Sequence, residues 1–70
     1  MADANNVELK KLIQAYGLAL DDVSAYTDYS LDMVKAWTAS PDSARYRVMQ
    51  DRALRLLKYE IQSRGLSPKN

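Results

Sequence analysis

Residues 17–39 read GLALDDVSAYTDYSLDMVKAWTA, and this stretch decides the fold. Two aspartates open a short apolar segment, which predicts a helix from about Leu20 to Tyr26 because acidic residues stabilise a first helical turn. Residues 27–30 predict a tight turn, since aspartate tolerates a left-handed backbone and serine is a good N-cap. A further helix is expected from Leu31 to about Ala39, where Pro41 prevents its continuation. The stretch therefore predicts two short helices joined by a tight turn.

Longer helices are expected on both sides of this pair. On the N-terminal side, Asn5 is placed as the N-cap of a helix that runs to Tyr16, with Gly17 as the left-handed residue that ends it. On the C-terminal side, apolar residues at helical spacing predict one long helix from Ala44 to Ser63. No run of residues alternates as a half-buried strand does. The expected fold is all-α, a compact four-helix domain with a long C-terminal helix.

The length and composition restrict both the architecture and the chemistry. Seventy residues form one domain at most, expected over residues 1–70 with residues 1–4 and 66–70 as disordered tails. The chain has no cysteine and no histidine, which removes thiolate nucleophiles and the commonest metal ligands. Both glycines end helices, so no glycine-rich phosphate loop is present. We therefore expect no enzyme, no cofactor, no bound metal and no small-molecule substrate.

Apolar residues are never continuous for long enough to cross a membrane, which takes about 20 of them. The N-terminus also lacks the basic and apolar regions of a signal peptide. These features predict a cytoplasmic protein with no membrane partner.

The net charge of +1 conceals an uneven distribution. Residues 1–43 contain three lysines or arginines against seven acidic residues, and residues 44–70 contain seven against two. Such asymmetry in a small domain is typical of a basic face for nucleic acid beside an acidic face turned away. It is equally consistent with helices that merely carry different surface charges.

Several residues of the opening stretch also fit a known pattern. An aliphatic and a small residue occur together in the first short helix, a left-handed residue in the turn, and two apolar residues three positions apart in the second helix. They are Val23, Ser24, Asp28, Val34 and Trp37. In this arrangement the small residue lets the helices cross closely, and the apolar pair anchors the second helix on the core. The stretch resembles the helix-turn-helix of the lambda-repressor and Cro-like family of DNA-binding regulators.

From Gly17 through the proline-bearing loop, the chain also resembles small phage regulators, including those associated with anti-CRISPR operons. The resemblance implies a sequence-specific transcription regulator that binds double-stranded DNA as a homodimer. The chain departs from the family before the first motif helix. Ala19 and Leu20 stand where many members have a serine or threonine and a glutamine that bind phosphate, and Asp21 and Asp22 follow.

If the motif docks as the family does, the exposed face of its second helix enters the major groove. That face comprises Ser30, Leu31, Asp32, Lys35 and Ala36. Lys35 suits guanine O6 and N7, Asp32 suits the cytosine amino group, and Leu31 or Ala36 suits a thymine methyl group. The same positions also have a structural interpretation, in which Ser30 is only a cap, Asp32 only a partner of the helix dipole and Lys35 only solvated.

Two further groups complete the candidate residues. Arg45 and Arg47 follow the loop after the second motif helix and suit DNA phosphates, although they are equally explained as solubilising the long helix. The apolar stripe of Leu54, Leu57 and Ile61 is a candidate dimer interface, with burial in the core as the alternative. The expected function is a phage-like DNA-binding transcription regulator. The alternative is a protein-interaction module that keeps the fold and binds another protein through its acidic front.

Overall fold

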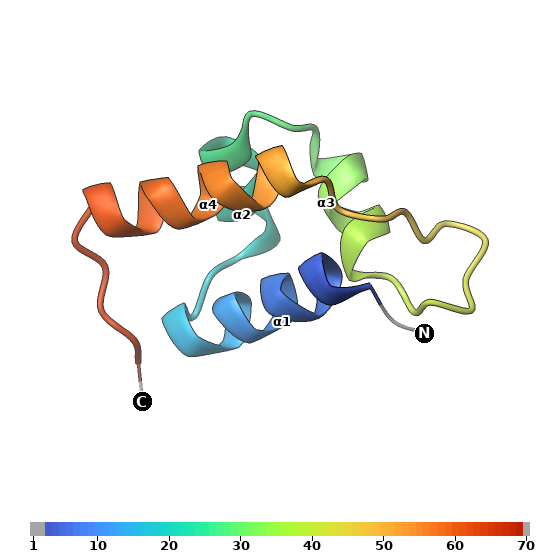
Figure 1. Cartoon of the computed structure of the whole chain (residues 1–70), viewed down its shortest axis with the longest axis horizontal. Coiled ribbons are helices and arrows are strands. Elements are labelled where there is room, and N and C mark those ends of the chain that lie inside the picture. The colour runs from blue at the N-terminus through green and yellow to red at the C-terminus, as the bar shows by residue number, and fades with distance from the viewer. Residues whose placement is uncertain (1–2, 70) are drawn as a thin grey trace.

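A computed structural model describes residues 3–69, which form four helices. They are α1 (Ala4–Tyr16), α2 (Leu20–Thr27), α3 (Leu31–Thr38) and α4 (Asp51–Ser63). In Figure 1, α1 and α4 run along opposite sides of the molecule, and α3 lies at the end from which the loop of residues 39–50 projects. No strand occurs among residues 3–69, which confirms the all-α prediction.

The turn between α2 and α3 forms as predicted. Asp28 has a φ of 62°, and its N–H donates to the Ser24 carbonyl at 2.9 Å, which closes α2. The Ser24 hydroxyl donates to the Tyr29 carbonyl at 2.6 Å and so fixes the exit from the turn. Ser30 then caps α3, because its hydroxyl oxygen accepts from the Met33 N–H at 3.2 Å. Local hydrogen bonds therefore set the angle between the two motif helices.

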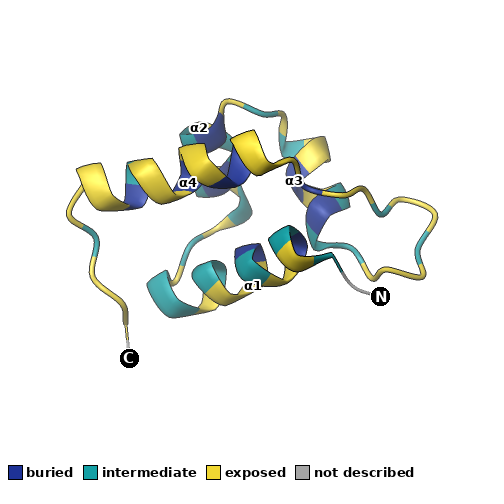
Figure 2. Cartoon of the chain, in the orientation of Figure 1, coloured by how far each residue is buried: buried dark blue, intermediate teal, exposed yellow. Residues whose placement is uncertain are grey.

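The core lies between the four helices, where the buried faces in Figure 2 meet. Its buried apolar residues are Leu9, Val23, Val34, Trp37, Met49, Ala53, Leu54, Leu57 and Ile61. Trp37 packs against Tyr29 with the ring centres 5.0 Å apart and the rings tilted by 59°. The predicted anchors of the motif, Val23, Val34 and Trp37, are thus confirmed as core residues.

The prediction of one long helix from Ala44 to Ser63 is wrong in its first part. Residues 46–50 lie outside any helix or turn, and α4 begins only at Asp51. The helical spacing of Tyr46 and Met49 with the apolar residues of α4 does not reflect a continuous helix. Met49 instead reaches the core from an irregular segment.

Side chains of α1 hold this segment in place. Asn6 is 3% exposed, and its amide donates to the Trp37 carbonyl at 2.9 Å and to the Arg47 carbonyl at 2.8 Å. Its oxygen accepts from the Met49 N–H at 2.8 Å. The neighbouring Asn5 donates to the Met49 carbonyl at 3.0 Å. These side-chain bonds satisfy the backbone groups that a helix would otherwise pair internally. The prediction of Asn5 as the N-cap of α1 is wrong, because the helix begins at Ala4 and its N-cap is Asp3.

The described residues of the two predicted tails contact the rest of the chain. Near the C-terminus, Leu66 packs against the core, and the Lys69 N–H donates to the Ala15 carbonyl at 2.6 Å. At the other end, the Tyr46 hydroxyl donates to the Asp3 carboxylate at 2.7 Å. This hydrogen bond raises the pKa of Tyr46, because ionisation of the phenol would break it. Residues 1–2 and 70 of the predicted tails lie outside the described residues.

Replacement of Asn6 by leucine is expected to destabilise the fold strongly. The substitution leaves the Met49 N–H and the Trp37 and Arg47 carbonyls without their partner, and an unsatisfied buried group costs about 1–3 kcal/mol. A loss of roughly 3 kcal/mol or more is a large part of the stability of a small domain. Urea denaturation followed by circular dichroism measures it. Asn5→Ala is the matched control and should cost only about 1 kcal/mol, since Asn5 is partly exposed. Equal losses in the two variants would contradict this role of Asn6.

The turn gives a second stability prediction. Asp28 is exposed, so Asp28→Ala removes no buried contact, yet it places alanine at a φ of 62°. We expect a loss of about 1 kcal/mol from the left-handed backbone alone. Asp28→Gly should be at least as stable as the wild type, because glycine adopts this conformation freely. An alanine variant as stable as the glycine variant would show that the positive φ carries no strain.

Candidate nucleic-acid interface

The sequence predicts five residues on the exposed face at α3, and three of them are exposed in the structure. Ser30, Asp32 and Lys35 are exposed, whereas Leu31 and Ala36 are half-buried. Val34 and Trp37 point into the core and hold the helix from its other side.

The loop after α3 turns back along this helix. The Arg47 N–H donates to the Ala36 carbonyl at 3.2 Å, and Asn6 holds the Arg47 carbonyl. The arginines of the loop are thereby placed beside the exposed face of α3. A hollow of about 280 Å³ lies between them, and its lining consists of Ser30, Asp32, Met33, Ala36, Arg45 and Arg47.

The hollow contains five of the seven residues that the sequence predicts for DNA binding. Leu31 and Lys35 lie on α3 but do not line it. The lining residue that the sequence did not predict is Met33, which is 38% exposed. The apolar pattern of the sequence did not decide between Met33 and Val34, because the two residues are adjacent and both apolar. Only one of them can face the core.

The two arginines of the hollow differ in how firmly they are held. The Arg47 guanidinium donates to the Tyr46 carbonyl at 2.8 Å and to the Ala44 carbonyl at 3.2 Å, which fixes its position. Arg45 is exposed, and no hydrogen bond of its side chain occurs within residues 3–69. Neither arginine forms an ion pair with an acidic residue in this part of the chain. Both guanidinium groups therefore keep donors for an external anion.

The N-terminus of α2 is already occupied by a carboxylate of the chain itself. Asp22 accepts a hydrogen bond from the Ala19 N–H at 2.9 Å, on the side where the resemblance would place a phosphate. Asp21 beside it is exposed. The acidic start of α2 thus has a structural use, since a carboxylate stabilises the positive end of a helix. The arginines beside α3 come from the loop after that helix instead.

The expected dimer interface on α4 is not available. Leu54, Leu57 and Ile61 are 8%, 0% and 5% exposed, and all three belong to the core of a single chain. They face α2 and α1 because α4 needs its whole apolar stripe to close so small a bundle. Burial in the core of one chain, the alternative interpretation of this stripe, therefore accounts for all three residues.

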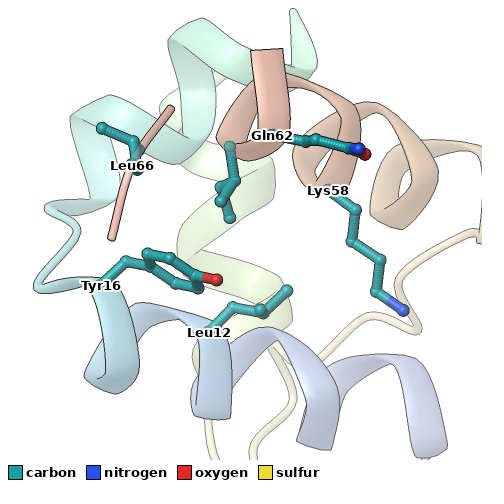
Figure 3. A pocket seen from close by; sticks show the side chains of 6 residues that line it. Leu12, Tyr16, Lys58, Gln62 and Leu66 are labelled. Atoms are coloured by element: carbon teal, nitrogen blue, oxygen red, sulfur yellow. The ribbon is translucent and has the colours of Figure 1, made fainter. Parts of the chain in front are cut away.

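A larger hollow of about 360 Å³ lies away from α3, between α1, α4 and the chain that follows α4 (Figure 3). Its lining is mainly apolar and consists of Leu12, Tyr16, Lys58, Ile61, Gln62 and Leu66. Lys58 is 3.9 Å from the Glu8 carboxylate, so its charge is partly balanced. This hollow contains none of the residues predicted to contact DNA.

Residues 3–69 contain no cluster of acidic side chains that could hold a metal ion. No helix formed by these residues has the length and apolar character of a membrane span. Comparisons with protein-family models, with curated proteins and with solved structures found no match to this chain.

Proposed function

We propose that this chain is a sequence-specific DNA-binding transcription regulator of the small phage type, with α3 as the helix that enters the major groove. The observation that carries the proposal is the hollow in which Arg45 and Arg47 face the exposed surface of α3. Base edges and phosphates lie close together along a groove, so a reading helix needs cations at its flank. The hollow between α3 and the loop after it provides that arrangement.

Each residue has a distinct role in this proposal. Arg45 and Arg47 neutralise phosphates beside the groove and supply affinity for any sequence. Lys35 donates to guanine, and Asp32 accepts from the cytosine amino group. Ala36 and Met33 offer apolar contact to a thymine methyl group. Ser30 uses its hydroxyl oxygen to cap α3 and keeps its hydroxyl hydrogen for a phosphate or base.

The alternative is a protein-interaction module that binds through the acidic side of the motif. Asp21, Asp28 and Asp32 are exposed, and none of them forms an ion pair within residues 3–69. A basic partner protein could use these charges. Affinity for DNA of random sequence distinguishes the two functions, because the acidic surface repels phosphate.

Binding of DNA is tested with a labelled duplex of random sequence, whose fluorescence anisotropy is followed at increasing salt. We expect affinity to fall steeply with salt for the wild type. Arg45→Ala combined with Arg47→Ala should reduce the slope of log affinity against log salt by about 2, because each neutralised phosphate contributes about 0.9 to that slope. Arg55→Ala is the control, because Arg55 is exposed on α4 and does not line the hollow. No binding by the wild type at low salt would refute the proposed function.

Sequence recognition by α3 is tested by selecting bound duplexes from a random pool and measuring the affinities of single-base variants. Lys35→Ala should reduce discrimination at one base pair by about tenfold, which corresponds to the 1–3 kcal/mol of a good side-chain contact with a base. Lys10→Ala, on the exposed side of α1, should leave every ratio unchanged. If Lys35→Ala weakens all variants alike, Lys35 contacts only phosphate and does not read a base.

A further inference from the structure

The larger hollow, between α1, α4 and the chain after α4, is bounded by side chains from all three. Leu12 and Tyr16 are four residues apart on α1, and Lys58 and Gln62 are four apart on α4, so each pair lies on one face of its helix. Leu66 closes a third side, and Figure 3 shows these side chains around the hollow. The volume of about 360 Å³ lies within the range of about 300–1,000 Å³ that is typical of small-molecule sites.

Backbone hydrogen bonds hold the third side in place. Gly65 has a φ of 65°, and its N–H donates to the Gln62 carbonyl at 3.1 Å. The Leu66 N–H donates to the Ile61 carbonyl at 3.2 Å. These two bonds form a Schellman motif, which turns the chain back at the end of α4. A later residue of the tail donates to a carbonyl of α1, as described above. The tail is thus attached to both helices, and Leu66 is fixed at the side of the hollow.

The walls of the larger hollow are mainly apolar. Ile61 is 5% exposed, and Leu12, Tyr16 and Leu66 are half-buried. Protein interiors contain few voids larger than a water molecule, so a space of this size between apolar side chains is unusual in a small domain. Water within it would contact carbon atoms on most sides and gain few hydrogen bonds. The hydrocarbon part of a ligand would displace this water and supply the packing contacts that the walls lack.

Two polar side chains of the hollow lie together. In Figure 3, Lys58 and Gln62 are at one side of it and Leu66 is at the opposite side. The Lys58 ammonium group has three donors and lies 3.9 Å from the Glu8 carboxylate, with the two side chains 52% and 42% exposed. A contact of this length and exposure is weak. The Gln62 side-chain amide forms no hydrogen bond within residues 3–69. An acceptor that enters the hollow therefore finds donors that no strong contact occupies.

We propose that the larger hollow binds a small amphipathic carboxylate, a compound with one ring or a short hydrocarbon chain and a single carboxylate group. The carboxylate accepts hydrogen bonds from Lys58 and Gln62. The hydrocarbon part packs against Leu12, Ile61 and Leu66. The ligand is bound without chemical change. The two hollows of the chain have no lining residue in common, so this binding does not depend on the proposed contact with DNA.

The charges around the hollow favour a ligand with one negative charge. Lys58 is the only ionised side chain in its lining, so a cationic ligand would be repelled there. A neutral ligand would gain nothing from the ammonium charge. Glu8 does not line the hollow but lies beside Lys58, and it would repel the second charge of a dianion such as a phosphate monoester. A monoanion is the class that matches one lysine with an acidic neighbour.

Binding is tested by titrating the whole chain, without DNA, with hydrocinnamate, which carries a phenyl ring on a short carboxylate chain. NMR signals of the backbone amides report where it binds. We expect saturable shifts at Gln62 and Leu66, with a dissociation constant of about 1 mM, and no shift at Lys35 on α3. The neutral amide of the same compound should bind about tenfold more weakly, and the corresponding amine more weakly still. No saturable shift, or equal affinities of the acid and either relative, would overturn the proposal.

Two variants separate the polar and apolar contacts. Lys58→Met keeps most of the side-chain stem and should weaken hydrocinnamate binding about tenfold, while the affinity for the neutral amide stays unchanged. Lys10→Met is the matched control, because Lys10 is exposed on α1 and does not line the hollow. Leu66→Ala should weaken binding of the acid and the amide alike, by about tenfold. Circular dichroism establishes that each variant keeps its helices. Wild-type affinity in Lys58→Met would overturn the proposal whatever the result for Leu66→Ala.

Discussion

One buried amide side chain joins α1 to the end of α3 and to the irregular segment that precedes α4. Asn6 satisfies three backbone groups, from the end of α3 and from the segment before α4. The side-chain nitrogen of Asn6 donates two hydrogen bonds and its side-chain oxygen accepts one. Its burial therefore leaves no unpaired polar atom. A segment without secondary structure cannot otherwise approach a core, because its backbone groups would lose water and gain no partner. Asn6 therefore permits Met49 to be buried and determines where α4 begins.

The same interaction shapes the surface for which we propose DNA as the partner. Because the Arg47 carbonyl is held from one side and its N–H by Ala36, the loop follows α3 and brings two arginines to its exposed face. Because the backbone groups of Arg47 and Met49 point inward, those of Val48 between them point outward. The hollow and the exposed position of Val48 are thus two consequences of one set of hydrogen bonds.

The sequence predicted the elements that depend on local interactions, such as the left-handed turn at Asp28 and the cap at Ser30. It did not predict the start of α4, because Asn6, which pairs with the Arg47 carbonyl and the Met49 N–H, lies about 40 residues earlier in the chain. Helical spacing was a misleading signal there, since a short extended segment can also supply one buried residue. The apolar stripe of α4 was ambiguous for another reason. Its sequence pattern is the same whether the stripe packs against its own chain or against a second one. In so small a domain the core requires the whole stripe, so folding leaves none of it for a dimer.

The aspartates of the acidic half of the chain also support the local structure of the motif. Asp22 caps α2, Asp28 adopts the left-handed turn, and Asp32 lies in the first turn of α3. Each aspartate thus serves the geometry of the motif, in a region where a DNA-binding surface needs few negative charges. Because these aspartates make the motif acidic, the cations that our proposal requires come from the loop after α3. A loop without helical hydrogen bonds can do so only if it is held rigidly, because flexible arginines lose conformational entropy on binding. The asparagines of α1 hold the chain after this loop at Arg47 and Met49, so the acidic motif and the basic loop are connected through the hydrogen bonds of Asn5 and Asn6.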